Sequence, residues 1–492
     1  MSSGYVIAID AGTTSVRCIA FDEHGSLRAR TGREFTQHFP RPGWVEHDPD
    51  EIWSVTAATL AELVVGLEGP VAAIGITNQR ETVVAWDRRT GRPLAPAIVW
   101  QDRRTAERCG ELEQAGHLPL VRERTGLVLD AYFSGTKVEW LLRNGLPNDA
   151  DLAVGTVDAW LMWCLTGGRV HATDPSNASR TMLFGLRSLA WEPELCDLLS
   201  VPMRALPEVR PSSGRFGVTR EIPGVPDGLP VSGVAGDQQA ALFGQACFSP
   251  GEVKNTYGTG SFVLLNIGSE VPEPAPGILT TVAWQLPGAP ATYALEAAIF
   301  VTGAAIQWLR DGLQIIEAAS ETGQLAASVA DTGGVYIVPA FVGLGCPWWD
   351  PYARGTITGV TRGTTRAHLA RAVVEAMAYQ SRDAIEAMAA HTSHPLRSLR
   401  VDGGASAMDL LLQLQADQLQ VPVARPRNQE TTALGAAYLA GLAEGVWDST
   451  DDLRSQWKLD LEALPGDRAV ADGLHAGWRR AVERSLAWAT PD

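Results

Sequence analysis

Short runs of apolar and β-branched residues alternate with turns along this chain. The first run, residues 5–9, predicts a strand; residues 10–15 predict a tight turn, and residues 16–21 predict the returning strand of a β-hairpin. A second turn with the same Gly-Thr pair, residues 256–261, leads into the apolar run 262–265. Two such turns predict a duplicated α/β fold in which each copy contributes one turn. Chance similarity of two short turns is the alternative.

Two further strands are predicted to end in charged residues. Residues 231–235 are small or β-branched and precede Asp237 and an apolar helical run, so a carboxylate lies at a strand end, where a general base is expected. Residues 72–76 precede Arg80 and Glu81. The alternatives are that Asp237 caps the helix and that Arg80 and Glu81 form a surface ion pair.

The second half of the chain repeats these signals. Residues 368–390 have helical spacing and predict a helix packed on a second sheet. Residues 399–405 predict a strand that reaches a glycine pair, which allows close approach of a ligand or merely makes a turn into the next helix. The pattern breaks at residues 244–251, so we expect two domains, 1–246 and 247–492.

Composition agrees with a folded globular protein. The 492 residues are 45% hydrophobic and 20% charged, which suits about two globular domains. The net charge of −16 argues against nucleic acid or an anionic membrane as partner, and an absence of long apolar runs argues against stable membrane insertion. Six scattered cysteines predict reduced core thiols in a cytoplasmic protein. We also expect a homo-oligomer, either a dimer or a tetramer.

The hydroxyl-rich turns suit phosphate binding. Backbone N–H groups and the side chains of Thr13, Thr14 and Ser15 can hold anionic oxygens, and Asp10 is a hard ligand suited to magnesium. The alternative is an ordinary polar turn. No phosphate-binding G-x-x-x-x-G-K-[ST] motif and no protein-kinase signature occurs, and only three lysines are present, so arginine must supply most cationic contacts. Arg17 is well placed for this, unless it is only an exposed strand residue.

Several longer motifs together resemble one known family. They are DAGTTSVR at 10–17, PGWVEHDP at 42–49, IGITNQRET at 74–82, YFSGTK at 132–137, TDPSNASRTMLF at 173–184, AGDQQAALFGQ at 235–245 and NTYGTG at 255–260. This set is similar to the FGGY carbohydrate kinase family, in particular to its glycerol-phosphorylating branch. The resemblance implies an α/β architecture of two actin-like, ribonuclease-H-like domains with the active site in the cleft between them.

The resemblance also implies roles for individual residues. It implies that Asp237 is the general base of phosphoryl transfer from ATP to glycerol, and that Asp10 and Asp237 hold Mg²⁺. It assigns glycerol binding to Arg80, Glu81, Trp100, Tyr132, Asp237, Gln238 and Phe262, and ATP binding to Thr13, Thr14, Ser15, Arg17, Thr259, Gly303, Gln307, Gly404 and Met408. Met408 departs from the family pattern, because many relatives carry an adenine-contacting asparagine there. Trp100 has a plain core position as its alternative.

The resemblance therefore favours ATP-dependent phosphorylation of glycerol to glycerol 3-phosphate. Two alternatives are phosphorylation of a related polyol or ketose, and nucleotide binding without catalysis. In some relatives a basic loop before AGDQQ binds fructose 1,6-bisphosphate. Here residues 221–230 contain three prolines, two acids and no lysine or arginine. We therefore expect no control by that ligand through this loop.

Overall fold

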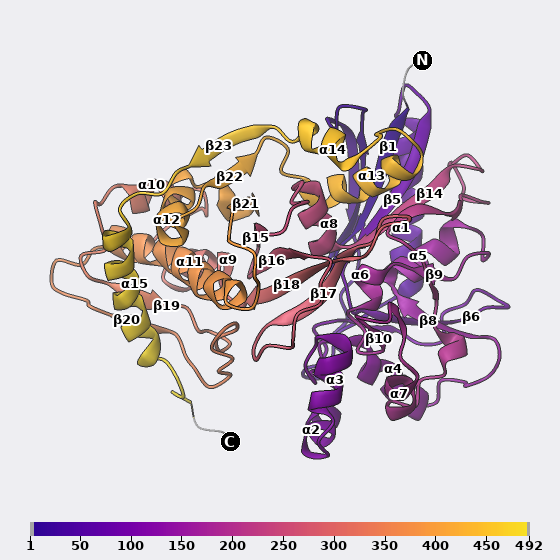
Figure 1. Ribbon diagram of the computed structural model, residues 1–492, viewed down its shortest axis with the longest axis horizontal. Coiled ribbons are helices and arrows are strands. Elements are labelled where there is room, and N and C mark those ends of the chain that lie inside the picture. The colour runs from indigo at the N-terminus through magenta and orange to yellow at the C-terminus, as the bar shows by residue number, and fades with distance from the viewer. Residues whose placement is uncertain (1–3, 490–492) are drawn as a thin grey trace.

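The computed structural model describes residues 4–489 and consists of two lobes, each built around a β-sheet (Figure 1). The first sheet contains β13 (Ser213–Val218), β14 (Pro230–Gly236), β5 (Val71–Asn78), β1 (Tyr5–Ala11), β2 (Ser15–Phe21) and β3 (Leu27–Glu34), in that order. The second contains β17 (Leu279–Trp284), β18 (Thr292–Ile299), β16 (Ser261–Gly268), β15 (Glu252–Tyr257), β21 (Ser398–Gly403), β22 (Val423–Pro426) and β23 (Leu459–Ala463).

Smaller sheets extend the first lobe and one edge of the second. They comprise β4 (Glu46–His47), β7 (Ala97–Ile98), β6 (Val83–Asp87) and β8 (Leu152–Thr156) in one sheet, and the pairs β9 (Ala172–Thr173) with β12 (Glu208–Val209), β10 (Phe184–Gly185) with β11 (Ala190–Trp191), and β19 (Tyr336–Val338) with β20 (Thr356–Thr358).

Helices cover these sheets. In the first half they are α1 (Pro49–Val65), α2 (Ala106–Gln114), α3 (Leu118–Thr125), α4 (Ser134–Arg143), α5 (Val157–Leu165), α6 (Pro175–Ala178), α7 (Pro193–Leu198), η1 (Met203–Ala205) and α8 (Asp237–Gly244). In the second half they are α9 (Gly303–Gln307), η2 (Trp308–Gly312), α10 (Glu321–Ala327), α11 (Arg366–Ala389), η3 (Gly404–Ala407), α12 (Asp409–Leu419), α13 (Thr431–Ala443), α14 (Thr450–Gln456) and α15 (Arg468–Glu483).

The two large sheets share one topology, which confirms the predicted duplication. The order β3-β2-β1-β5-β14-β13 in the first sheet corresponds to β18-β16-β15-β21-β22-β23 in the second. In both, successive pairs are antiparallel, antiparallel, parallel, parallel and antiparallel. The predicted hairpins are β1–β2 and β15–β16. Each therefore occupies the same place in its sheet, and its turn lies at an equivalent edge.

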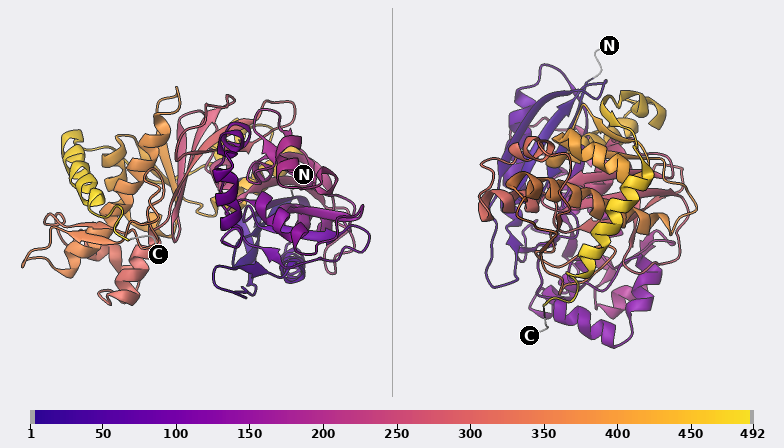
Figure 2. Two further views of the ribbon diagram at one scale, coloured as in Figure 1. Left: turned by 90° about the horizontal axis from the view of Figure 1, so that it is seen from below. Right: turned by 90° about the vertical axis from the view of Figure 1, so that its left-hand side faces the viewer.

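Helix α13 crosses from the second half of the chain to the first sheet. Its sequence is apolar on all sides, and it packs against β1, β5, β14 and α8. The approach is close, because a Cβ atom added to Gly75 would lie 2.1 Å from the backbone oxygen of Ala436. Figure 1 shows α13 beside β1 and β5, and Figure 2 shows the two lobes side by side. The lobes thus share chain segments, and the cut at residue 246 stays a prediction.

Other sequence predictions are confirmed within small shifts of boundary. The predicted helix 368–390 is α11, and the strand predicted before the glycine pair is β21. All six cysteines are free thiols, and five of them are buried. Between residues 4 and 489, no helix combines the length and apolarity that crossing a membrane requires.

Candidate active site

Asp237 is the first residue of α8, directly after β14. The N-cap position belongs to Gly236, so the alternative assignment of Asp237 as the N-cap residue is wrong. The Oδ1 atom of Asp237 accepts a hydrogen bond of 2.7 Å from the backbone N–H of Gln238 and lies 3.2 Å from Nε of Arg80. The side chain is 32% exposed. A carboxylate that is oriented by contacts to one oxygen and is partly exposed can accept a proton from a bound molecule.

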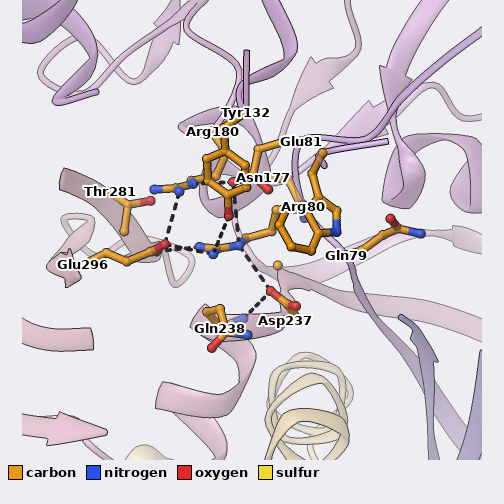
Figure 3. A network of polar contacts seen from close by, with 12 residues as sticks. Gln79, Arg80, Glu81, Tyr132, Asn177, Arg180, Asp237, Gln238, Thr281 and Glu296 are labelled. Atoms are coloured by element: carbon orange, nitrogen blue, oxygen red, sulfur yellow. Dashed lines mark hydrogen bonds and ion pairs between the residues drawn. The ribbon is translucent and has the colours of Figure 1, made fainter. Parts of the chain in front are cut away.

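Arg80 and Glu81 follow β5 and are almost completely buried, so the alternative of a surface ion pair is wrong. The two terminal nitrogens of Arg80 donate to the two carboxylate oxygens of Glu296, at 2.6 and 2.9 Å (Figure 3). Glu296 lies on β18 of the second sheet and was missed by sequence reasoning. The available signal was a single acidic residue inside an otherwise apolar strand, since such a residue is seldom buried unpaired.

Arg180 is a second buried arginine that sequence reasoning left without a role. Its Nε donates to Oε1 of Glu81 at 2.7 Å, and one terminal nitrogen donates to Oε1 of Glu296 at 3.1 Å. Its guanidinium carbon lies 5.6 Å from the Tyr132 ring centroid. Although burial opposes ionisation of Glu296, the guanidinium groups of Arg180 and Arg80 lower its pKa to about 2. Two arginines and two glutamates therefore form one buried, ion-paired cluster.

Aromatic side chains lie beside this cluster. Trp100 is only partly buried, so it is not a plain core residue, and its Nε1 donates to the hydroxyl of Thr13 at 3.0 Å. The Trp100 and Tyr132 rings meet edge to face at 5.6 Å. The guanidinium of Arg80 lies 5.9 Å from the Phe262 ring. The structure thus brings the predicted polar and aromatic residues together at one place, with Phe262 coming from the second sheet.

The first hydroxyl-rich turn is closed by a hydrogen bond of 3.0 Å from the Gly12 N–H to the Ser15 carbonyl. Arg17, on β2, contacts Oδ2 of Asp10 at 2.5 Å and Oε2 of Glu430 at 2.8 Å, and its side chain is 41% exposed. Burial raises the pKa of Asp10, and the charge of Asp237 raises it further, against the opposing effect of Arg17. Asp10 and Asp237 are therefore close enough to repel each other.

The second turn is joined to the start of α9. The Gly258 N–H donates to the Gly260 carbonyl at 2.8 Å, and the Gly303 N–H donates to the Gly258 carbonyl at 3.0 Å. Thr259 and Gln307 are exposed. Thr259 and Gly303, which are far apart in the sequence, thus lie side by side. Gln307 is the last residue of α9, which begins at Gly303.

The glycine pair lies next to this turn, because Gly403 pairs with Tyr257 in parallel register. Gly403 has a φ of +83°, and an added Cβ would lie 2.4 Å from the Tyr257 carbonyl oxygen. Glycine is therefore required here by the backbone conformation and by the close approach of β15. Gly404 is different. An added Cβ there would contact nothing within 4 Å, so the position is open to a ligand. Met408 lies one turn later and packs on Gly323 of α10.

Lys254 is a further residue that sequence reasoning missed. It lies on β15 and is fully buried; its Nζ donates to Oε1 of Gln238 and, at 3.0 Å, to the hydroxyl of Thr256. Burial lowers the pKa of Lys254 to about 8, against the attraction of Asp402 and Asp237. The signal in the sequence was the rarity of lysine, since one of only three lysines precedes the second turn.

Two family models match this chain. Residues 5–244 match the N-terminal domain, and residues 253–444 the C-terminal domain, of the FGGY family of carbohydrate kinases. The chain is 55% identical to glycerol kinase 2 of Thermotoga maritima over 98% of this chain and 99% of that protein, and 54% identical to glycerol kinase of Carboxydothermus hydrogenoformans over 99% of both.

Among solved structures, Plasmodium falciparum glycerol kinase with ADP superposes with a TM-score of 0.94. It is 34% identical to this chain and covers 99% of each chain. Family matches over both halves, near-complete relatives at this identity and the duplicated actin-like fold lead to one conclusion. The chain belongs to the FGGY family of carbohydrate kinases.

Proposed function

We propose that this protein transfers the γ-phosphoryl group of ATP to glycerol and forms sn-glycerol 3-phosphate. The observation that carries the proposal is the Asp237 carboxylate, which is partly exposed and oriented by Arg80 where residues of both sheets meet. The names of the relatives at 54–55% identity support glycerol as acceptor, and the ADP in the solved structure of Plasmodium falciparum glycerol kinase supports ATP as donor.

In the proposed reaction Asp237 accepts the proton of a primary hydroxyl as that oxygen attacks the γ-phosphorus in line. Arg80, Glu81, Tyr132 and Gln238 bind the hydroxyl groups, because arginine and amide N–H groups donate while carboxylates accept. Trp100 and Phe262 pack against the carbon edge in this proposal. Positioning of the two reactants supplies most of the rate enhancement, as is general for phosphoryl transfer.

The nucleotide is proposed to lie between the two hydroxyl-rich turns. The residues assigned to the phosphates are Thr13, Thr14, Ser15, Arg17 and Thr259, and those assigned to the nucleoside are Gly303, Gln307, Gly404 and Met408. The open face of Gly404 and the hydrogen bonds that join Gly303 to the second turn support this assignment. Arg17 would exchange part of its ion pairing with Asp10 and Glu430 for phosphate oxygens.

The carboxylates of Asp10 and Asp237 are a suitable pair to hold Mg²⁺. Within residues 4–489, no hydrogen bond uses Oδ1 of Asp10 or Oδ2 of Asp237, and the two charges repel each other. The described residues form no cluster of three or more metal-binding side chains, which fits a cation held by few carboxylates and by substrate phosphates. A bound magnesium ion neutralises charge on the phosphate oxygens.

An assay of ADP release tests the proposal directly. The acceptors are glycerol, a panel of pentuloses and no acceptor at all. Glycerol-dependent release supports the proposed function, whereas preference for a pentulose assigns the protein to another branch of the family. Nucleotide binding without release under any condition points to a binding protein.

Domain roles, oligomeric state and location in the cell are also proposed. We place the glycerol site and the base in residues 1–246 and the rest of nucleotide binding in residues 247–492. Two exceptions cross this boundary: Phe262 joins the glycerol set from the second half, and the first turn with Arg17 joins the nucleotide set from the first half. We propose a homo-oligomer, either a dimer or a tetramer, which sedimentation velocity can measure. We propose a cytoplasmic location, which the six free thiols support because reducing compartments keep thiols free.

A further inference from the structure

We propose that Glu296 is a positioning residue for acceptor recognition. It orients Arg80 directly, and Glu81 through Arg180, so that both side chains can bind adjacent hydroxyl groups of the acceptor. This inference rests on the proposed function and adds a residue to it. Glu296 belongs to the second sheet, whereas the three residues that it organises belong to the first half of the chain. Acceptor recognition would therefore require the second sheet to keep its position relative to the first lobe, so that Glu296 stays within hydrogen-bond distance of both arginines.

The guanidinium group of Arg80 is held on every side. Glu296 accepts one hydrogen bond from each terminal nitrogen, at 2.6 and 2.9 Å. The remaining N–H groups face Gln239 at 3.2 Å, the Tyr132 hydroxyl at 3.5 Å and Asp237 at 3.2 Å. The edge that faces Tyr132 and Asp237 is the one directed toward two of the predicted substrate residues (Figure 3). The two-point bond to Glu296 fixes the plane of the guanidinium, and therefore the direction of that edge.

Glu81 is held through Arg180. Oε1 of Glu296 accepts from Arg180 at 3.1 Å, and Arg180 in turn donates to Oε1 of Glu81 at 2.7 Å. Glu81 has a φ of +62°, a backbone conformation that a residue other than glycine keeps only when its surroundings enforce it. The guanidinium of Arg180 also lies 5.2 Å from the Phe133 ring. One carboxylate thus orients both the donor and the acceptor that the proposed function assigns to hydroxyl binding.

The position of Glu296 is itself rigid. Its strand, β18, is paired on both sides, with Glu296 opposite Leu264 of β16 and Leu279 of β17. β16 also begins at the second hydroxyl-rich turn. The carboxylate that contacts Arg80 therefore belongs to the same sheet as the two strands that flank the turn with Thr259, a proposed phosphate-binding residue. A shift of this sheet relative to the first would move Glu296 and rotate Arg80.

The test is steady-state kinetics of Glu296→Gln, which keeps the size of the side chain and removes its charge. Loss of charged hydrogen bonds predicts that the KM for glycerol rises about 10- to 100-fold, while the KM for ATP changes less than about threefold. Glu296→Asp restores the charge on a shorter side chain and should recover part of the glycerol affinity. This conservative variant also serves if Glu296→Gln fails to fold.

The matched control is Glu375→Gln on α11. Glu375 is equally buried and paired with Arg371 at 2.7 Å, but it belongs to another cluster. It should lower the melting temperature and leave both KM values unchanged. A folded Glu296→Gln with a glycerol KM within threefold of the parent overturns the inference, as does an equal rise in Glu375→Gln. A parent protein without glycerol turnover refutes the proposed function and this inference together, so the two failures are distinguishable.

Discussion

Oδ1 of Asp237 and Nε of Arg80 lie 3.2 Å apart, although one residue begins a helix and the other follows a separate strand. Their strands, β14 and β5, are parallel neighbours, so both side chains emerge at the same edge of the sheet. Arg80 is also bonded to both carboxylate oxygens of Glu296, so the group that contacts Asp237 is itself held by a two-point ion pair. This contact brings the proposed general base and the proposed acceptor-binding group to one site.

Asp237→Asn should lower turnover by about 10² to 10⁴-fold, because asparagine has similar size but cannot accept the hydroxyl proton. The measurement is kcat in the ADP-release assay. Thermal melting separates loss of catalysis from loss of fold. Asp311→Asn, at an exposed aspartate paired with Arg310, is the matched control and should leave kcat unchanged. A folded Asp237→Asn enzyme with turnover within threefold of the parent would refute the base assignment.

Arg80→Ala should weaken glycerol use by about 2–4 kcal/mol, because a charged hydrogen-bond donor is removed from the acceptor site. The burial of Glu296 adds a second expectation. Its carboxylate loses one of two arginine partners, so the free energy of unfolding should also fall, by about 3–5 kcal/mol. Glycerol and nucleotide affinities are measured separately, by calorimetry or fluorescence. An equal loss of nucleotide affinity would mean that Arg80 binds the phosphate groups of the nucleotide instead.

The pH dependence of stability should reveal Lys254. Its folded pKa of about 8 is below the unfolded value, so the unfolded chain binds more protons between pH 8 and about 10.5. The contribution of Lys254 to the free energy of unfolding is therefore lowest below pH 8 and increases through that window, by about 1 kcal/mol per pH unit.

Urea unfolding of the parent and of Lys254→Met at several pH values isolates this contribution, because all other titrating groups are common to both. The parent should gain stability relative to the variant as the pH rises. A constant difference between pH 7 and pH 10 would show that Lys254 titrates normally.

Fructose 1,6-bisphosphate should not inhibit this protein through the loop 221–230. The loop is closed on itself, since the Glu221 N–H donates to Asp227 at 2.7 Å and the Thr219 hydroxyl to the Pro226 carbonyl at 2.7 Å. Prolines lack an N–H, and the acids repel phosphate. Initial rates are titrated with millimolar fructose 1,6-bisphosphate at fixed magnesium. Saturable inhibition that disappears on mutation of the loop would contradict the expectation.

The local elements were predictable because neighbouring residues determine them. The apolar runs before each turn are read directly as strands, and both hairpins formed where the Gly-Thr turns predicted them. The carboxylate of Asp237 follows a strand and begins a helix in the sequence as in the structure. Placement of these residues at a common site followed from motif resemblance, since periodicity cannot tell which strand ends meet.

What the tertiary structure alone decided is which distant residues share a buried environment. Glu296 is the single charged residue of a mainly apolar strand, and Lys254 is one of several polar residues in β15. Only the tertiary structure shows that Glu296 contacts Arg80 and that Lys254 contacts Gln238. Helix α13 is apolar on all sides, so its sequence does not say which sheet it covers. A buried charge is stable only with a partner close in space, and that partner can come from any part of the chain. The sequence therefore does not show which residues form such a pair.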